Sequence, residues 1–251
     1  MSRLGMADLG VATLNDMRDN ASTIASLSPS TPLIADADTG YGGAIQVGRT
    51  VTSYIRAGVA GLHLEDQVVS KRCGHLAGKQ VVETDEYIAR IRAAVLARSR
   101  SGGDVVLIAR TDALQGRGYD DAVARLKRAV DVGADVAFLE GVTSREQAER
   151  FVADLAPTPC LFNNVPGGVS PDFSAGEART IGYRVAIFPT VGLEAVYTAV
   201  RKGVRALLDD GVIRGEAGKE RVGIHEMFEV CGIEGAMEFD REAGGGAWDE
   251  V

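Results

Sequence analysis

The chain has 251 residues with 45% hydrophobic content, enough to bury one large core, and α/β chains of this size are commonly single domains. Its formal net charge of -8 at pH 7 argues against nucleic acid as a partner, since no basic stripe could displace counterions from phosphates, and fits a carboxylate-bound metal ion better. Three scattered cysteines, no signal-like start and no apolar run of membrane-spanning length predict a soluble cytoplasmic (intracellular) protein without disulfides or membrane contact.

The chain begins with a loop and one amphipathic helix, whose apolar residues recur at helical spacing: Leu14, Met17, Ala21 and Ile24. Six short apolar runs follow, at residues 32–36, 59–65, 105–110, 136–140, 160–163 and 184–189. Helical patterns lie between them, at residues 120–132 and 144–155 among others. Ser144 and Gln147 predict a capping box at one helix start, and Gly58 and Gly133 predict helix ends just before two of the runs. Apolar strands that alternate with helices indicate a parallel sheet.

Nearly every apolar run ends in polar residues at its C-terminal side. These are Asp36 and Asp38, Glu65 and Asp66, Arg110 and Asp112, Glu140, and Asn163. In a (β/α)8 barrel of the TIM type, such strand ends would line a single pocket at one mouth. The alternative is an open doubly wound sheet, which should show a glycine-rich phosphate turn after its first strand, and none is visible. We therefore favour the barrel. Six runs fall short of eight strands, so we expect its first one or two strands, which should precede residue 32, to be lacking.

The C-terminal part of the chain has a different pattern. We expect residues 1–215 to form the N-terminally shortened (β/α) barrel domain and residues 216–251 to form a C-terminal helical segment and tail. The latter contains an amphipathic stretch: Ile224, Met227, Phe228, Val230 and Cys231. A glycine run at residues 244–246 and an acidic end follow it.

Residues 71–79, with the sequence KRCGHLAGK, place a single cysteine among cations. Lys71, Arg72 and a protonated His75 would favour the thiolate and lower the pKa of Cys73 below the usual value of about 8.5. A cysteine in this position can serve as a proton donor or nucleophile. The alternative is an ordinary basic surface loop with an incidental thiol.

Four segments taken together resemble one known superfamily. They are residues 34–42 (IADADTGYG), 63–67 (HLEDQ), 71–75 (KRCGH) and 109–112 (ARTD). They are similar to the isocitrate lyase and phosphoenolpyruvate mutase superfamily, and closest to its methylisocitrate lyase and 2,3-dimethylmalate lyase branch. The likeness extends from about Leu4 to the neighbourhood of Cys231. The loop with Cys73 resembles that of the lyases, because the carbon–phosphorus mutases and hydrolases carry a different loop without this cysteine.

The resemblance implies a Mg2+ site, with Mn2+ as a substitute. Asp36, Asp38 and Glu65 would hold the metal ion, Asp38 most directly, while Asp8 and Glu65 would act through water. Such a site agrees with the preference of Mg2+ for oxygen ligands and with its tendency to keep several waters. The alternative for Asp36 and Asp38 is a helix N-cap and a solvated turn.

The resemblance also implies a reaction, the cleavage of a small 2-hydroxy di- or tricarboxylate, of the 2,3-dimethylmalate or methylisocitrate type, to an α-keto acid and a carboxylate. Cys73 would protonate the enolate carbon as a general acid. Arg110 would donate two parallel hydrogen bonds to the part of the substrate that becomes the keto acid. Lys71 and His75 complete the catalytic set, His75 by positioning the loop. The substrate-binding residues would be Asp8, Gly74, Arg110, Glu140, Asn163 and Pro189. Arg110 could instead be a structural partner of Asp112 or Glu140.

Three features depart from the family pattern. Pro189 stands where the fungal oxaloacetate hydrolases have serine, which favours lyase activity. Pro166 stands near a position where lyase relatives commonly carry a glutamate. Relatives also have a strand, a helix and a second strand with a carboxylate-binding turn before the residues that match Ser2–Leu4. We therefore expect weaker catalysis or dependence on contacts between subunits, since open sheet edges invite association.

Relatives pack their terminal helix against a neighbouring subunit, so we expect exchange of the C-terminal helix in a homodimer or homotetramer. The alternative is a helix folded on its own barrel. Two further functions remain open. One is an oxaloacetate decarboxylase-like or hydrolase-like enzyme, and the other is a catalytically impaired member with a binding or assembly role.

Overall fold

A computed structural model of the chain describes residues 3–213 and 222–248. The chain divides into two compact units, Met1–Leu193 and Glu194–Val251. The predicted boundary between residues 215 and 216 falls in the segment 214–221, outside the described residues, and stays a prediction. No helix among the described residues combines the length and apolarity needed to cross a membrane.

The first unit is built on a parallel sheet whose strand order is the chain order. Its six strands are β1 (Ile34–Asp36), β2 (Gly61–Glu65), β3 (Val106–Thr111), β4 (Val136–Leu139), β5 (Cys160–Asn163) and β6 (Val185–Ile187). Every pair of neighbours is parallel. A doubly wound sheet would reverse its strand order at a switch point, and this sheet does not. The predicted TIM-type architecture is confirmed, with six strands in the described part of the chain.

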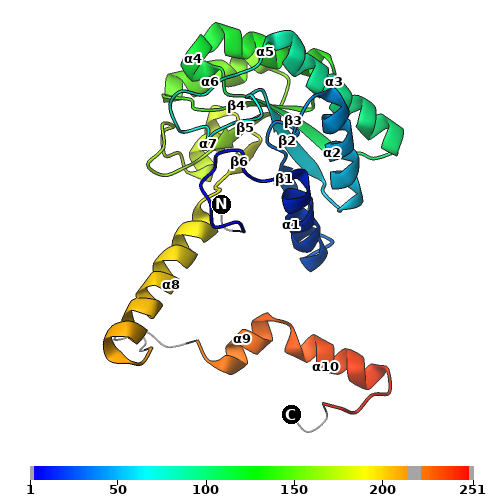
Figure 1. Ribbon diagram of the computed structural model, residues 1–251, viewed down its shortest axis with the longest axis vertical. Helices are drawn as coiled ribbons and strands as arrows, with labels where there is room; N and C mark the ends of the chain where they lie inside the picture. The colour runs from blue at the N-terminus through cyan, green and yellow to red at the C-terminus, as the bar shows by residue number, and fades with distance from the viewer. Residues whose placement is uncertain (1–2, 214–221, 249–251) are drawn as a thin grey trace. The chain divides into compact units, whose positions relative to one another are not determined.

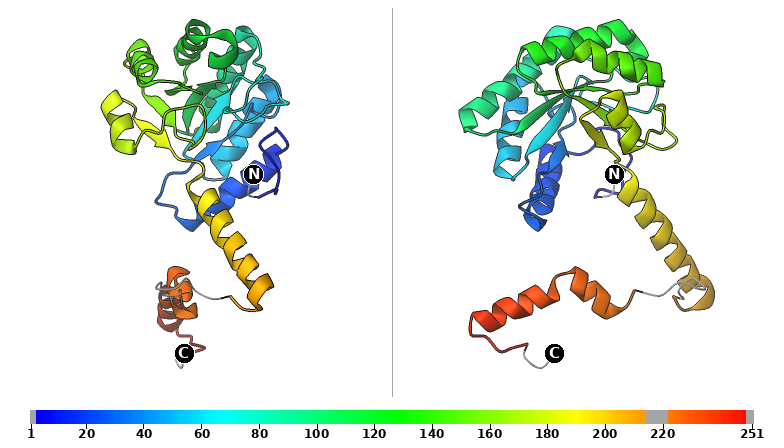
Figure 2. Two further views of the ribbon diagram at one scale, coloured as in Figure 1. Left: turned by 90° about the vertical axis from the view of Figure 1, so that its left-hand side faces the viewer. Right: turned by 180° about the vertical axis from the view of Figure 1, so that it is seen from behind.

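Helices follow the strands and lie on the outer side of the curved sheet (Figures 1 and 2). They are α2 (Ala44–Arg56), α3 (Thr84–Ser101), α4 (Leu114–Arg117), α5 (Tyr119–Asp131), α6 (Arg145–Leu155) and α7 (Ala175–Ile181), with α1 (Leu14–Leu27) ahead of β1. Gly58 and Gly133 adopt φ values of +84° and +111° just after α2 and α5, which confirms both predicted helix ends. Ser144 caps α6 by accepting from the backbone N–H of Gln147, as predicted. The side chain of Gln147 accepts from the backbone N–H of Thr143 and not from that of Ser144, so the second hydrogen bond of the capping box is shifted by one residue.

The alternation of side chains along the strands positions the site. Outward residues such as Leu62 and Leu64 pack beneath the helices in the main core. Inward residues form a small apolar cluster inside the barrel: Ile108, Val136, Phe138 and Leu161. Two residues further along β3, β4 and β5, the next inward positions are Arg110, Glu140 and Asn163. A polar layer therefore lies directly above the apolar one, at the C-terminal ends of the strands.

The C-terminal helices are described by themselves. They are α8 (Val191–Asp210), which begins three residues before the unit boundary, α9 (Ile224–Val230) and α10 (Ile233–Glu242). α9 coincides with the predicted amphipathic stretch. No residue in these helices is buried, and apolar side chains such as Val191 and Val230 are 76% and 85% exposed.

Candidate active site

The turn after β1 brings two carboxylates together. The backbone N–H of Asp38 donates to Asp36 Oδ1 at 2.7 Å, and Asp38 adopts a φ of +46°, which is uncommon for a residue with a side chain. The next helix, α2, has Gly43 as its N-cap, so neither aspartate caps it. The predicted alternative of a helix cap is therefore wrong.

Lys71 lies between the carboxylates of this corner. Its buried Nζ is 2.7 Å from Asp38 Oδ1, 3.0 Å from Asp8 Oδ1 and 3.9 Å from Glu65 Oε1. Lys71 therefore neutralises the acidic corner, and it brings Asp8, from the N-terminal segment, to the ends of β1 and β2.

The pKa values of the two aspartates are shifted in opposite directions. Burial and the negative charge of Asp36 raise the pKa of Asp38 to about 6, although Lys71 opposes this. For Asp36, burial acts in the same direction, but the positive charges of His63, Lys71 and Arg110 outweigh it and lower its pKa to about 2. An added cation at this corner would therefore favour the ionised form of Asp38.

Arg110, at the end of β3, is the second centre of charge. Its Nε and Nη2 donate to the carboxylate of Asp112 at 2.9 and 3.2 Å. Its Nη1 lies 3.3 Å from Glu65 Oε2, and its Nη2 lies 3.5 Å from Glu140 Oε2. Asp112 thus grips one edge of the guanidinium, and the other edge faces Glu65 and Glu140. The alternative role of Arg110 as a partner of Asp112 and Glu140 is therefore present, and the edge that faces Glu65 and Glu140 is directed toward the site.

The Cys73 loop packs directly on this centre. A Cβ atom added at Gly74 would lie 2.5 Å from Arg110 Nη2 and 2.5 Å from Glu140 Cγ. Only glycine therefore allows the loop to approach so closely. Cys73 itself is partly buried, and its backbone N–H donates to the carbonyl oxygen of Asp8 at 3.0 Å.

The predicted lowering of the pKa of Cys73 is wrong. Burial raises the pKa of this thiol, and the negative charge of Asp8 adds to the effect, whereas a backbone hydrogen bond from His75 opposes it. The neighbouring cations face elsewhere, because Lys71 binds Asp8 and Asp38 and Arg72 Nη1 donates to the carbonyl oxygen of Ala77. The site therefore keeps Cys73 as a thiol, which suits a proton donor better than a nucleophile.

His75 connects the loop with the ends of β4 and β5. Its Nδ1 accepts from the backbone N–H of Val169 at 3.1 Å, so Nε2 carries the proton, and Nε2 lies 3.3 Å from Glu140 Oε1. Burial lowers the pKa of His75, although Glu140 opposes this. Asn163 Nδ2 donates to Glu140 Oε2 at 3.0 Å. Gly74, His75, Glu140 and Asn163 are therefore brought together as predicted.

Pro189 is the exception among the predicted residues. It lies exposed in the turn between β6 and α8, and none of the described contacts of the ion-pair network involves it.

Sequence reasoning missed the residues that support the aspartate corner. The buried Tyr54 of α2 donates to the carbonyl oxygen of Asp36 at 2.7 Å, and the hydroxyl of Tyr41 lies 3.2 Å from that of Tyr54. His63 Nδ1 lies 3.3 Å from Asp36 Oδ1. The sequence does indicate His63, because it lies two residues before Glu65 on β2 and two such side chains share one face of a strand.

A second set supports Arg110 from behind; Asp66 was predicted at a strand end, but its partner Arg125 was missed. The buried Asp66 accepts from the backbone N–H of Asp112 at 2.9 Å and from the hydroxyl of Thr111 at 2.5 Å. Arg125 of α5 donates to Asp66 at 3.3 Å. Asp66 therefore fixes the backbone from which Asp112 grips Arg110.

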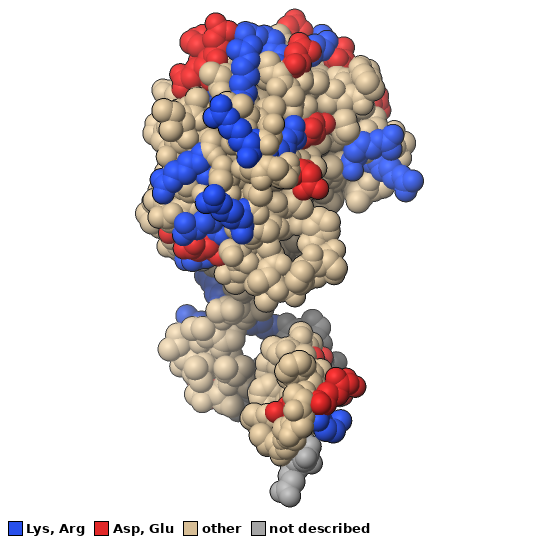
Figure 3. All heavy atoms as spheres, turned by 90° about the vertical axis from the view of Figure 1, so that its right-hand side faces the viewer, with Lys and Arg blue, Asp and Glu red and all other residues tan. Residues whose placement is uncertain are grey.

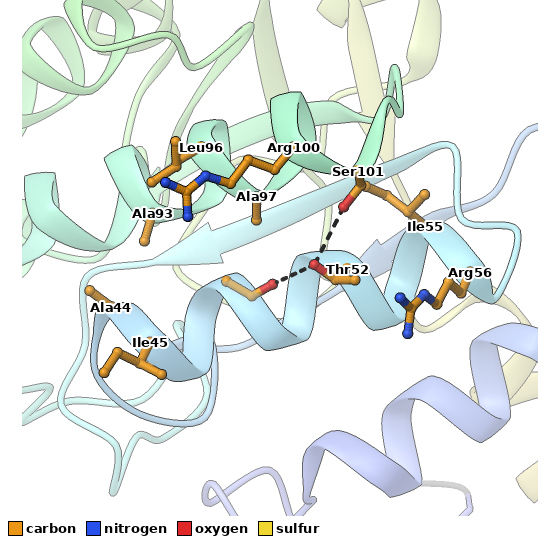
Figure 4. A pocket seen from close by; sticks show the side chains of 11 residues that line it. Ala44, Ile45, Thr52, Ile55, Arg56, Ala93, Leu96, Ala97, Arg100 and Ser101 are labelled. Carbon is orange, nitrogen blue, oxygen red and sulfur yellow. Dashed lines mark hydrogen bonds between the residues drawn. The ribbon is translucent and has the colours of Figure 1, made fainter.

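Two cavities open beside the aspartate corner. One, of about 190 Å³, is lined by the segment 4–12, Met17, Asp36 and Asp38, and another, of about 330 Å³, reaches Asp38 and Lys71. A larger hollow of about 790 Å³ lies between α2 and α3 (Figure 4). The titratable residues that line this hollow, Arg56 and Arg100, are exposed. Lys and Arg side chains on this side of the molecule lie at several separate places and are not gathered in one patch (Figure 3). The chemistry-bearing residues thus gather at the strand ends and not in the larger hollow.

The charge balance of the strand-end site fits a divalent cation. Its carboxylates are Asp8, Asp36, Asp38, Glu65, Asp112 and Glu140, and its cations are Lys71, Lys79 and Arg110. Both buried oxygens of Glu65 lack a hydrogen-bond partner. Among the described residues, no three His, Cys, Asp or Glu side chains are arranged to hold a metal ion by themselves.

Replacement of Gly74 by alanine is expected to displace the loop, because the added methyl group would overlap with Arg110 and Glu140. Overpacking of this kind costs about 1–3 kcal/mol, which predicts at least roughly fivefold faster alkylation of Cys73 by iodoacetamide. Peptide mass spectrometry measures the rate at Cys73 separately from Cys160 and Cys231. Gly176→Ala, where the added atom meets only Ser174 Oγ at 3.9 Å, is the control. Equal rates in both variants would show that the loop tolerates a side chain at position 74.

Comparison with known sequences gives a consistent result. The family described as phosphoenolpyruvate phosphomutase matches residues 2–208. The 2,3-dimethylmalate lyase of Eubacterium barkeri is 36% identical over 239 residues, which cover 95% of this chain and 81% of that protein. The 2-methylisocitrate lyase of Salmonella typhimurium is 41% identical over 209 residues, which cover 83% of this chain and 70% of that protein.

Solved structures agree with the sequence relatives. A crystal structure of 2,3-dimethylmalate lyase, a member of the PEP mutase/isocitrate lyase superfamily, has a TM-score of 0.93 and 53% identity, covering 99% of this chain and 82% of that one. Oxaloacetate acetylhydrolase bound to 3,3-difluorooxalacetate has a TM-score of 0.93 and 54% identity, covering 98% and 82%. Phosphonopyruvate hydrolase in complex with oxalate and Mg2+ has a TM-score of 0.77 and 28% identity, covering 92% and 79%.

Proposed function

The chain belongs to the phosphoenolpyruvate phosphomutase family, within the PEP mutase/isocitrate lyase superfamily, and from this premise we propose that it is a Mg2+-dependent carbon–carbon lyase. Its substrate is a small 2-hydroxy di- or tricarboxylate of the 2,3-dimethylmalate or methylisocitrate type, and its products are an α-keto acid and a carboxylate. The observation that carries this proposal is the packing of the Cys73 loop on Arg110 and Glu140, next to the carboxylate pair at the end of β1.

The carboxylates of Asp36 and Asp38 would hold the metal ion, and Glu65 would act through water. Bound there, Mg2+ would act as a Lewis acid that stabilises negative charge on the hydroxyl and carboxylate oxygens of the substrate. Lys71 sets the charge of this corner, since it contacts Asp38 and Asp8 directly. Tyr54 holds the backbone of Asp36 in place, so the pair is preorganised.

The substrate hydroxyl loses its proton to a base or to water, and its carbon becomes a ketone. The electron pair of the broken carbon–carbon bond stays on the carboxylate fragment, as an enolate. The edge of the Arg110 guanidinium that faces Glu65 and Glu140 would bind substrate oxygens, while Asp112 keeps the group oriented. Cys73 then donates the proton of its thiol to the enolate carbon. Glu140 and Asn163 orient substrate oxygens, and the closed loop excludes water that would otherwise compete for the enolate.

Oxaloacetate hydrolysis is the second candidate, because oxaloacetate acetylhydrolase is as similar to this chain as the lyase structure is. Pro189 argues against it, since the serine that the fungal oxaloacetate hydrolases have at this position could supply a hydroxyl and proline cannot. We therefore place lyase activity first. The impaired-member hypothesis finds little support, because the described residues bring the predicted carboxylates, Arg110 and the Cys73 loop together.

The predicted homodimer or homotetramer, with exchange of the C-terminal helix, stays a prediction. It is supported by the lack of buried residues in α8, α9 and α10, and by the exposed apolar side chains that these helices carry. Such helices would gain stability by packing against another surface.

Purified protein with Mg2+ is expected to release an α-keto acid from 2,3-dimethylmalate or 2-methylisocitrate, measured in a coupled dehydrogenase assay. Chelation of the metal should abolish the signal, and added Mg2+ should restore it. Asp38→Ala should lose activity, whereas Asp104→Ala, at an exposed position before β3, should retain it. Release of oxalate and acetate from oxaloacetate, without cleavage of either hydroxy acid, would favour the hydrolase instead.

A further inference from the structure

Lys79 lies near the C-terminal end of the Cys73 loop and reaches back into the site. Its side chain is only 3% exposed. Its Nζ donates to the carbonyl oxygen of Gly74 and lies 3.4 Å from Asp112 Oδ1. A single buried ammonium group therefore joins the tip of the loop to the residue that grips Arg110.

The base of the loop is held by other contacts. Gln67 and Val81 form an antiparallel bridge, and the backbone N–H of Val68 donates to the carbonyl oxygen of Gln80 at 2.9 Å. The side-chain amide of Gln67 binds both the backbone N–H and the carbonyl oxygen of Arg72, at 3.2 and 2.9 Å. The bond from Lys79 is therefore not needed to close the loop at its base, and it acts on the tip, residues 73–78.

Asp112 is shared between two cations. It accepts two hydrogen bonds from Arg110 on one side and faces Lys79 on the other, and it is fully buried. When the loop lies in the observed position, Gly74 contacts Arg110 and Lys79 completes the environment of Asp112. Withdrawal of the loop would separate Gly74 from Lys79 and leave Asp112 held by Arg110 alone.

We propose that Lys79 is a positioning residue that couples closure of the Cys73 loop to the orientation of Arg110. The proposal rests on the proposed lyase function for its effect on turnover, but not for its effect on the loop. Lys79 holds the proton donor over the site, and through Asp112 it fixes the guanidinium that binds substrate. Both groups are then aligned in the same closed state.

Hydrogen exchange of the full-length, ligand-free protein tests the effect on the loop. Lys79→Met is expected to raise exchange of the backbone amides of residues 73–78 at least about fivefold, because the loop tip opens more often. Lys79→Gln keeps a donor for the carbonyl oxygen of Gly74 but offers no charge to Asp112, so it should fall between Lys79→Met and the wild type. Lys127→Met, which alters an exposed lysine on α5, is the control. Wild-type exchange in both Lys79 variants would overturn the inference.

Turnover tests the effect on Arg110. Because misplacement by about 1 Å can cost about 100-fold, Lys79→Met should lower kcat roughly 10- to 100-fold while KM changes less than about threefold. If Lys79 had only a structural role, Lys79→Met would lower the melting temperature without lowering kcat selectively over KM. That result would overturn the proposed coupling. Absence of cleavage by the wild-type protein would refute the proposed function, whereas the exchange experiment would still decide whether Lys79 holds the loop.

Discussion

Replacement of Cys73 by serine is expected to lower kcat for cleavage about 10²- to 10⁴-fold, the range that a positioned proton donor contributes. Serine keeps the size of the side chain, but its hydroxyl is a far weaker acid than a thiol. Binding of substrate should change much less, because proton donation follows the cleavage of the carbon–carbon bond. KM should therefore stay within about threefold of the wild-type value.

Cys231→Ser is the matched control, because Cys231 is an exposed cysteine that follows α9 in the second unit. It should leave kcat unchanged. If Cys73→Ser also retained the wild-type kcat, the proton donor would be another group, and the packing of the loop on Arg110 would have only a structural role.

The pH dependence of kcat gives an independent check on Cys73. Since burial raises the pKa of this thiol, the protonated form persists through neutral pH and is lost only as the pH rises through the raised pKa. The alkaline limb of the profile should therefore lie above the value of about 8.5 that is typical of an ordinary cysteine. A limb below that value would instead indicate a stabilised thiolate.

The sheet and its polar rim could be predicted from the sequence for a simple physical reason. Every strand alternates inward and outward side chains, so a polar residue two positions after an inward apolar one lies in the layer above it. Phe138 on β4 and Glu140 just after it are one such pair, and Leu161 and Asn163 on β5 are another. The six predicted runs coincide with β1 to β6, within one to two residues at most ends.

The electrostatics of the loop could not be predicted in the same way. Adjacency in sequence suggested that Lys71 would act on Cys73, but Lys71 binds Asp8 and Asp38, and Asp8 is 63 residues away. The support of Arg110 by Asp66 and Arg125 likewise joins three separate elements. Such pairings depend on the packed fold, and no local spacing indicates them.

Replacement of Arg110 by methionine should destabilise the protein by about 3–5 kcal/mol, the usual cost of removing one partner from a buried ion pair. The guanidinium faces Glu65, Asp112 and Glu140, all of which are buried, and methionine would leave the three carboxylates without it. Urea denaturation at pH 7.5 measures the change. Arg92→Met, on the exposed side of α3, should cost much less.

The loss of stability in Arg110→Met should depend on pH in a defined direction. In the wild type, the positive charges of Arg110 and then Lys79 outweigh burial and hold the pKa of Asp112 below its ordinary value. Asp112 therefore contributes stability above the pKa of the unfolded chain, and this contribution is lost as the pH falls through the lower, folded value. Without Arg110 the contribution disappears at neutral pH. The difference between variant and wild type should consequently persist from pH 7.5 to about 4 and shrink only as the pH falls below the ordinary value of 3.8 toward the lower, folded pKa of Asp112.

Arg110→Lys separates charge from geometry. It keeps a cation among the three carboxylates, so most of the stability should return, but an ammonium group cannot present two parallel N–H groups to a substrate carboxylate while Asp112 holds its other edge. We expect kcat/KM to fall roughly 10²-fold, similar to the loss of one charge-stabilising donor in other active sites. Equal losses of stability in Arg110→Lys and Arg110→Met would mean that hydrogen-bond geometry, and not charge, holds the buried carboxylates. Full activity in Arg110→Lys would show that two parallel N–H groups are not needed for catalysis, and Arg110 would then be only a structural counter-ion of Asp112.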